Sequence, residues 1–392
     1  MKLLVFAHRP PPLHGQSAMV ATLVDGLAGD REVELLHVDA RVSHSGDEIG
    51  TWRIAKPARL LAACFRAWRL RSRHGPAVLY YVPAPGKRIA LYRDLAVMLL
   101  CRPFFPKLIL HWHASGLGAW LSSEANWLER RLAQAALGRA DLAIVLAPEL
   151  EPDARRLLPK AVRVVPNCVA DPGEPPERSP RPADAPGTVL FLGLCTREKG
   201  LFDALEAVAL ANSAGRRCRL VVAGGFPKPA EAEEFRVRSE RLGSHIAEYV
   251  GFADEDRKRE LFRSADVFCF PTSYPHEAQP LTIMEALAHD LPIVASNWRS
   301  IPGMVPAAHV WLVEPGHPAA IATALVAALD SPPPGGALRR HYLEHFSPDR
   351  HLASLKAALL SVAAPDTNEH EGPGRFEPQM NSDGHRFGPR QA

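Results

Sequence analysis

Short apolar runs alternate with stretches of helical periodicity along most of the sequence, and this alternation constrains the fold more than any other feature. The apolar runs have the length of buried strands, and the stretches between them have the length of helices. Such alternation is typical of parallel βαβ units. In the first part of the chain we expect strands at 3–7, 33–38, 78–82, 108–112, 142–146 and 162–165, with helices at 17–27, 57–71, 88–100 and 123–137.

A proline-rich segment interrupts the alternation. Residues 171–187 contain six prolines and few apolar side chains, which predicts a linker. The alternation then restarts, so we predict an α/β protein with two Rossmann-like, doubly wound domains facing a cleft. The predicted parts are a first domain at 1–170, the linker at 171–187, a second domain at 188–339, a helix at about 340–364 that packs back on the first domain, and a disordered tail at 365–392.

Charge and cysteine usage narrow the class of protein. The net charge of +3 gives no general signal for nucleic-acid binding. Six cysteines without CxxC spacing argue against a disulfide framework or a zinc site and fit a reducing compartment. The longest apolar run, 95–101, is far shorter than a membrane span, and the N-terminus resembles a strand rather than a signal peptide. We expect a cytoplasmic protein, either soluble or bound to the inner face of a membrane.

One basic segment supports the expectation that the protein is bound to the inner face of a membrane. Residues 52–73 mix arginines and a lysine with aromatic side chains and contain no acidic residue. A helix of this kind can lie on an anionic membrane surface. The same pattern also suits a solvated helix that covers the first sheet, and the sequence leaves both interpretations open.

Two glutamates, Glu277 and Glu285, stand eight positions apart around a predicted helix start at Pro280. Carboxylates near a helix N-terminus can accept hydrogen bonds from the vicinal hydroxyls of an extended ligand. The helix N-terminus itself favours an anionic group such as a diphosphate. Without further context, the two glutamates could equally be ordinary acids at the start of a solvated helix.

The context of the pair carries a family resemblance. Residues 270–296 resemble the Glu-x7-Glu signature of family 4 retaining glycosyltransferases, and residues 164–169, 191–200 and 250–271 resemble segments around it. The resemblance implies the GT-B fold of two facing Rossmann-like domains. It also implies transfer of a sugar from a UDP-, GDP- or ADP-linked donor to a glycan or lipid-linked acceptor, in cell-surface polysaccharide or glycolipid biosynthesis. Neither a metal nor another cofactor is implied.

The resemblance also implies roles for individual residues. The implied catalytic group is Glu277 on the donor sugar, Lys199 on the diphosphate and His113 on the sugar's primary hydroxyl. Because side chains alternate along a strand, His111 shares a face with His113, and their roles could be exchanged. Further donor-binding residues are Glu285 on the ribose, Arg197, Gly193, Ala278, Gln279, Leu281, Gly251 and Phe252, and the acceptor-side loop contains Gly15 and His14.

Three departures from the family pattern keep other functions open. Leu194 stands where the family has an arginine, which Arg197 could replace. Ala278-Gln279-Pro280 replaces a glycine-rich loop, and Asp290 replaces a glycine at a helix end, where it would be strained. Two alternatives therefore remain: a nucleotide-sugar epimerase of the same shape, and a non-catalytic nucleotide-sugar-binding protein.

Overall fold

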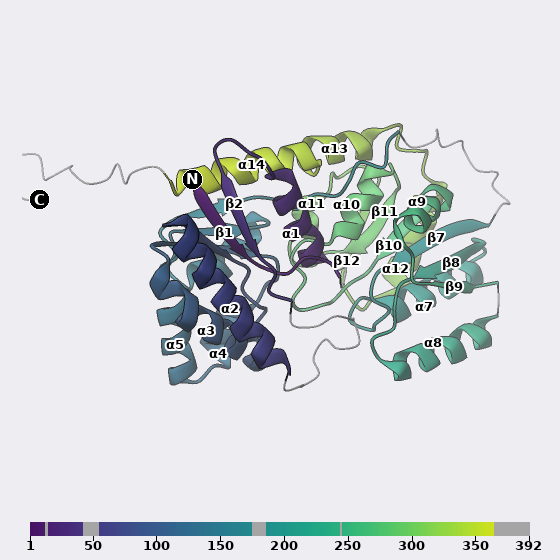
Figure 1. Ribbon diagram of the computed structural model, residues 1–392. Helices are drawn as coiled ribbons and strands as arrows, with labels where there is room; N and C mark the ends of the chain where they lie inside the picture. Colours follow the sequence, from purple (N-terminus) through teal and green to yellow (C-terminus); the bar gives the residue numbers. More distant parts are fainter. Residues whose placement is uncertain (12–14, 42–54, 175–185, 244, 364–392) are drawn as a thin grey trace, which may run out of the picture.

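The computed structural model describes residues 1–11, 15–41, 55–174, 186–243 and 245–363. It contains two six-stranded parallel sheets, one in each half of the molecule (Figure 1), which confirms the predicted α/β fold. The first sheet has the order β2-β1-β3-β4-β5-β6. Its strands are β1 (Lys2–Phe6), β2 (Glu34–Val38), β3 (Val78–Tyr81), β4 (Lys107–Trp112), β5 (Leu142–Val145) and β6 (Val162–Val164).

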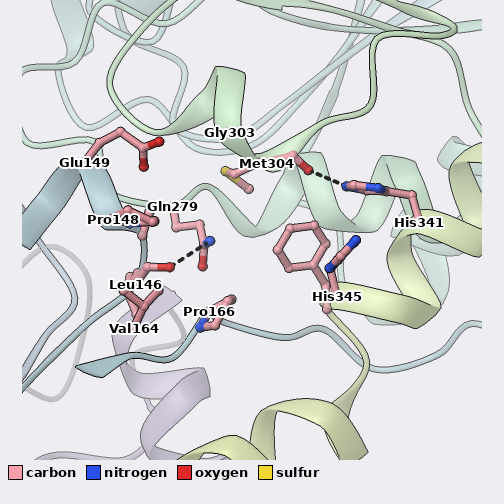
Figure 2. A pocket seen from close by; sticks show the side chains of 12 residues that line it. Leu146, Pro148, Glu149, Val164, Pro166, Gln279, Gly303, Met304, His341 and His345 are labelled. Atoms are coloured by element: carbon pink, nitrogen blue, oxygen red, sulfur yellow. Dashed lines mark hydrogen bonds between the residues drawn. The ribbon is translucent and has the colours of Figure 1, made fainter.

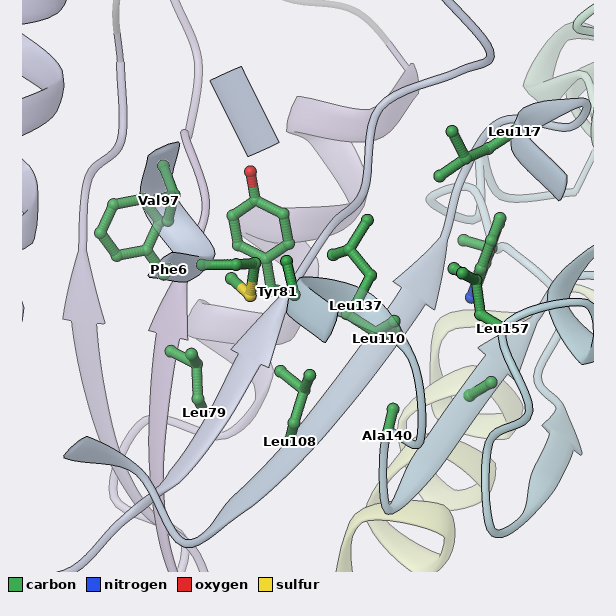
Figure 3. Packing of buried hydrophobic residues seen from close by; sticks show 14 of the residues in the cluster. Phe6, Leu79, Tyr81, Val97, Leu108, Leu110, Leu117, Leu137, Ala140 and Leu157 are labelled. Atoms are coloured by element: carbon green, nitrogen blue, oxygen red, sulfur yellow. The ribbon is translucent and has the colours of Figure 1, made fainter. Parts of the chain in front are cut away.

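Helices cover both faces of the first sheet. Phe6, Leu79 and Leu110 point to one face and pack against α2, α3, α4 and α5 (Figure 3). The alternate residues, such as Val5 and Ile109, point to the opposite face and pack against α1 and α14. The helices of this half are α1 (Gly15–Gly26), α2 (Ala55–His74), α3 (Arg88–Cys101), η2 (Arg102–Phe104), α4 (Leu117–Ser123), α5 (Trp127–Leu137), η3 (Pro148–Leu150) and α6 (Glu151–Arg155).

The second sheet has the order β12-β11-β10-β7-β8-β9. Its strands are β7 (Gly187–Leu192), β8 (Cys218–Ala223), β9 (Ala247–Gly251), β10 (Val267–Phe270), β11 (Ile293–Ser296) and β12 (Val310–Val313). One face packs against α7, α8 and α12, and the other against α9, α10, α11 and α13. These helices are α7 (Leu201–Ser213), α8 (Pro229–Leu242), α9 (Glu255–Ser264), α10 (Leu281–Ala288), α11 (Ile301–Met304), α12 (Pro318–Asp330) and α13 (Ala337–His345).

The last described helix, α14 (Pro348–Ser361), returns to the first half of the molecule (Figure 1). Leu355 and Leu359 are buried against the first sheet, and the Lys356 Nζ lies 2.7 Å from an Asp30 carboxylate oxygen. The helix predicted at 340–364 is thus two helices, α13 and α14. Pro348 starts the second, because proline fits the first turn of a helix but not its interior.

The helix predicted at 123–137 was wrong at its start. The structure has α4 and α5 there, separated by 124–126. The Asn126 side chain accepts a hydrogen bond from the Glu129 N–H at 2.9 Å, and the Glu129 carboxylate accepts one from the Asn126 N–H at 2.9 Å. This capping box satisfies backbone groups that a continuous helix would use internally, so a new helix begins here. The domain boundaries stay a prediction, because residues 175–185 and the predicted tail lie outside the described residues.

Asp290 adopts the left-handed conformation expected at that helix end, with φ 51°. Its carboxylate also accepts hydrogen bonds from the N–H groups of Gly336 at 2.7 Å and Leu338 at 3.0 Å. It therefore caps the start of α13, which glycine could not do. The neighbouring Arg339 donates to the Ala288 carbonyl oxygen at 3.1 Å and pairs with Asp171 at 2.9 Å, so one cluster holds α10, α13 and the start of the predicted linker.

We predict that Asp290→Ala destabilises the fold by about 1 kcal/mol, the usual cost of losing a helix cap. Asp290→Asn is the matched control, because its one side-chain oxygen still accepts one of the two hydrogen bonds and asparagine tolerates the left-handed conformation. Thermal unfolding followed by circular dichroism measures the difference. An alanine variant as stable as the asparagine variant would show that the cap contributes nothing.

Candidate functional site

The order of the second sheet reverses between β7 and β10. From β7 the chain moves outward to β8 and β9, then crosses to β10 on the other side of β7. At such a switch point the loops after the two central strands diverge and leave a crevice where ligands bind. These loops are 193–200 and 271–280, and each contributes one predicted catalytic residue: Lys199 and Glu277.

The two side chains are in direct contact. The Lys199 Nζ lies 2.6 Å from the Glu277 Oε2, and both side chains are largely shielded, 15% and 8% exposed. The Thr272 hydroxyl donates to the same carboxylate oxygen at 3.2 Å. The ammonium group also lies 4.7 Å from the centre of the Tyr274 ring, which adds a cation–π contact. A fixed cation and a fixed carboxylate therefore lie side by side at the edge of the sheet.

Backbone geometry brings the two loops together. Gly200 has φ 82°, and a Cβ atom there would lie 2.1 Å from the Pro271 carbonyl oxygen. Only glycine allows this approach. The Ser273 N–H donates to the Glu198 carbonyl oxygen at 2.8 Å, which fastens the loops a second time.

Glu285, on α10, pairs with a residue that sequence analysis did not identify. Its Oε1 lies 2.6 Å from the Nζ of Lys258, on α9, and the two side chains are 16% and 18% exposed. Burial raises the pKa of Glu285, and the nearby Lys258 only partly offsets this effect. Burial lowers the pKa of Lys258, but Glu285 and Glu255 outweigh it, and the net shift is upward.

The first half of the molecule supplies the loop after β4. The Ser115 hydroxyl donates to the Glu277 carbonyl oxygen at 3.0 Å, and the His276 Nδ1 donates to the Ser115 carbonyl oxygen at 3.0 Å. His113 is half-buried two residues before Ser115. Its ring lies 4.1 Å from that of His111, centre to centre, so the two share a face as predicted.

The two histidines differ in their surroundings. His111 is 1% exposed, contacts the Tyr80 hydroxyl through its Nδ1, and has a pKa that burial holds well below the usual range. His113 is only partly buried. This difference favours His113 over His111 as the residue that meets a ligand.

The segment before α10 offers backbone donors. Within the described part of the chain, the N–H groups of Ala278, Gln279 and Leu281 meet no protein acceptor. Gly15 lies against this helix start, since a Cβ atom on it would be 3.7 Å from the Leu281 Cδ1. The predicted acceptor-side loop thus meets the predicted donor loop, although His14 lies outside the described residues.

Other predicted donor-binding residues lie around the crevice with different orientations. The Arg197 Nη2 lies 2.6 Å from a Glu234 carboxylate oxygen on α8, and the guanidinium stacks on the Phe202 ring at 4.6 Å. Phe252, which follows Gly251 at the end of β9, is 74% exposed. The Gly193 N–H donates to the Ala223 carbonyl oxygen at 3.1 Å, which joins the ends of β7 and β8.

Three residues of this site were not predicted from the sequence: Lys258, Thr272 and Tyr274. Only Thr272 and Tyr274 carried a signal, their place in the loop before Glu277, whereas nothing in the sequence connects α9 to Glu285.

Among the described residues, no three His, Cys, Asp or Glu side chains gather where they could hold a metal ion.

A hollow of about 150 Å³ lies between the two halves, beside the loop of Glu277 (Figure 2). Gln279 projects into it from the second half and donates to the Leu146 carbonyl oxygen, at the end of β5, at 3.1 Å. The remaining lining comes from the end of β5, the region around β6, α11 and α13, and includes Glu149, Pro166, Met304, His341 and His345.

The second half matches a known family. Residues 186–331, which include Lys199, Glu277 and Glu285, match the model described as glycosyl transferases group 1. The match therefore lies within the second half of the molecule.

Individual relatives align with part of the chain. The putative colanic acid biosynthesis glycosyltransferase WcaL of Escherichia coli is 29% identical over 201 residues, which are 46% of this chain and 48% of that protein. The phosphatidyl-myo-inositol mannosyltransferase of Mycobacterium leprae is 33% identical over 144 residues, 36% of this chain and 37% of that protein. The alignments thus span about half of the first relative and little more than a third of the second.

Solved structures resemble nearly the whole chain. Sucrose-phosphate synthase from Thermosynechococcus elongatus superimposes with a TM-score of 0.70 at 19% identity, covering 93% of this chain and 100% of that one. Anabaena HepE in complex with UDP gives a TM-score of 0.67 at 15% identity, covering 92% and 100%. These similarities confirm the predicted GT-B fold, and residues 186–331 lie in its second half.

Proposed function

We propose that the protein is a retaining glycosyltransferase of family 4, which transfers a sugar from a nucleotide-sugar donor to a glycan or lipid-linked acceptor. The observation that carries the proposal is the Lys199–Glu277 pair at the switch point of the second sheet, 2.6 Å apart and shielded from solvent. A sugar diphosphate needs a cation and a hydroxyl acceptor side by side, and this pair supplies both. The carboxylate of Glu285 on α10 supplies a second hydroxyl acceptor.

In the proposed complex the donor lies across the ends of β7 and β10. Lys199 contacts the diphosphate, Glu277 the sugar hydroxyls and Glu285 the ribose hydroxyls. The N–H groups of Ala278, Gln279 and Leu281 face the phosphates or the sugar. Phe252 offers an exposed ring on which the base can stack. The base could be uracil, guanine or adenine, and the UDP-bound HepE structure supports the first of these.

The proposed reaction needs no enzyme nucleophile. The bond between the anomeric carbon and the diphosphate oxygen breaks, and the acceptor hydroxyl bonds to the same face of that carbon. The acceptor proton passes to the departing phosphate oxygen. Lys199 stabilises the negative charge that develops on the diphosphate, so its contact strengthens in the transition state. His113 and Glu277 orient the sugar.

We predict that Lys199→Ala and Glu277→Ala each remove most of the turnover, because one leaves the diphosphate charge uncompensated and the other leaves the sugar unoriented. Product formation is followed by mass spectrometry, with UDP-, GDP- and ADP-sugars offered alongside lipid-linked glycan acceptors. Lys228→Ala, which removes an exposed lysine on the same domain, is the control and should retain full activity. Near-native turnover in either site variant would contradict the assigned roles.

The same assay distinguishes a glycosyltransferase from a nucleotide-sugar epimerase and from a non-catalytic binding protein. An epimerase would release an altered sugar and a nucleoside diphosphate without an acceptor, and a binding protein would bind the donor without any turnover. The proposed mechanism involves no metal, so activity should persist in a chelator. Loss of activity in the chelator would contradict that part of the mechanism.

We predict that donor affinity falls as the pH falls through the raised pKa of Glu285. Only the carboxylate accepts both ribose hydroxyls, and its pKa is above the ordinary range because of burial. Affinity is therefore full above this pKa and lost below it, by at most about tenfold per pH unit for one proton. Titration calorimetry with the best-bound nucleotide sugar measures the profile. Glu285→Gln should bind weakly with a flat profile, and an unchanged slope in this variant would exclude Glu285 as the titrating group.

We further propose that the first half lies on an anionic membrane surface, where a lipid-linked acceptor would be found. On α2, Leu61 and Phe65 are 57% and 63% exposed and stand one turn apart, near exposed arginines. The adjacent α3 and α5 add Ile89 and Trp127, each 69% exposed. These helices lie together on one flank of the molecule (Figure 1). Within the described ranges, no helix is both long and apolar enough to cross a bilayer.

We predict that the protein floats with vesicles of phosphatidylcholine and phosphatidylglycerol but not with phosphatidylcholine alone. The double variant Arg69→Gln/Arg73→Gln should bind about fivefold more weakly per arginine, at about 1 kcal/mol per basic residue near the surface. Phe65→Ser should also weaken binding, whereas Leu210→Ser, an exposed leucine on α7 in the other half, should not. Equal flotation with neutral vesicles would contradict the proposal.

A further inference from the structure

The loop that contains Glu277 belongs to the second half of the molecule, but much of its support comes from the first. Two residues after Glu277, the Gln279 side chain reaches the first half and is 7% exposed. Its Nε2 donates to the Leu146 carbonyl oxygen at 3.1 Å (Figure 2). Its Oε1 accepts from the Asn167 N–H at 2.6 Å. The Asn167 Nδ2 approaches the Gln279 carbonyl oxygen at 3.4 Å.

Both ends of the Gln279 side-chain amide form hydrogen bonds. The carbonyl end meets a donor and the amino end meets an acceptor, so neither a carboxylate nor an apolar side chain of the same length can replace both bonds. The partners are also distinct parts of the first half. Leu146 follows β5, and Asn167 follows β6 just before the predicted linker. A single side chain therefore joins the donor loop to the end of the first sheet and to the chain that connects the two halves.

A second tether holds the same loop two residues earlier, at Glu277. The hydroxyl of Ser115, which follows β4, donates to the Glu277 carbonyl oxygen at 3.0 Å. The backbone of Glu277 is thus fixed between two attachments to the first half, while its side chain faces Lys199 of the second. A shift of one half against the other would either break these bonds or move Glu277 relative to Lys199.

We propose that Gln279 is a positioning residue, which makes the placement of Glu277 depend on how the two halves of the molecule are docked. This inference rests on the proposed function, because it assigns Glu277 to the donor sugar. The Gln279 side chain does not touch the reacting atoms and acts through the backbone of the Glu277 loop. The sugar subsite is complete only when the amide bridges Leu146 and Asn167, whereas nucleotide binding through Glu285 does not depend on the bridge.

The first test is independent of turnover. In Gln279→Met, which keeps the length of the side chain but makes neither bond, peptides covering 271–283 should exchange backbone hydrogens faster than in the wild-type protein. Gln134→Met is the matched control, because Gln134 also donates to a backbone carbonyl, that of Leu157, but on α5, away from the loop. Unchanged exchange in 271–283 would overturn the tether.

The second test separates positioning from general destabilisation. Gln279→Met should lower kcat by about a hundredfold, the usual cost of misplacing a reacting group by about 1 Å. Its affinity for UDP should fall far less than kcat, because Glu285 and the exposed Phe252 ring still hold the nucleoside. Faster exchange without a loss of kcat would overturn the positioning role, as would an equal loss of kcat and UDP affinity.

Gln279→Glu provides a pH signature. The carboxylate repels the Leu146 carbonyl oxygen, but the protonated acid can donate to it while its other oxygen accepts from Asn167. The activity of this variant relative to wild type should therefore rise as the pH falls through the pKa of the new carboxyl group, whereas that of Gln279→Met stays constant. Equal profiles for the two variants would overturn the bridge. If the wild-type protein transfers no sugar while the exchange result holds, the proposed function fails and the tether remains.

Discussion

The contact between Lys199 and Glu277 depends on the close approach of two loops, and the rest of the site depends on this contact. Gly200 has no side chain to separate the loops, and the Ser273–Glu198 backbone bond fastens them. A shielded ion pair is a weak source of stability, because the lost hydration of both charges offsets most of their attraction. The proposed contribution of the Lys199–Glu277 pair is to ligand binding rather than to stability. A sugar diphosphate can bind to both members of the pair, so the ligand replaces the interactions that the pair loses.

The parallel sheets explain why such distant residues meet. In each half, every strand ends at the same edge, so the loops that follow them face the other half across the crevice. Lys199 follows β7, Glu277 follows β10, and Ser115 follows β4. The first half thus holds the Glu277 loop through the Ser115 hydroxyl. The return of α14 to the first half, with the pairing of Lys356 and Asp30, binds the two halves a second time.

Much of this architecture could be predicted from the sequence, because apolar periodicity and turn residues encode it locally. The strands, the doubly wound fold and the residues of the Glu-x7-Glu segment were within reach. The break before α5 was missed, since the capping box of Asn126 and Glu129 interrupts a pattern that otherwise continues. The partner of Glu285 was also missed, because Lys258 on α9 meets it only through tertiary packing. The assigned roles of the individual site residues stay predictions.

The departures from the family pattern are instructive because the structure gives two of them a physical reason. Asp290 adopts a strained backbone conformation, and its carboxylate caps the start of α13. This helix leads into α14, which returns to the first half. Gln279 lies in a loop that is often rich in glycine in the resembled family. Its side chain makes hydrogen bonds to the first half, and its N–H group meets no acceptor among the described residues. In both cases, where the resembled family pattern has glycine, this chain has a residue that makes specific hydrogen bonds between separate parts of the chain. Such substitutions exchange local freedom for a defined arrangement of the two halves, and that arrangement determines where Glu277 lies.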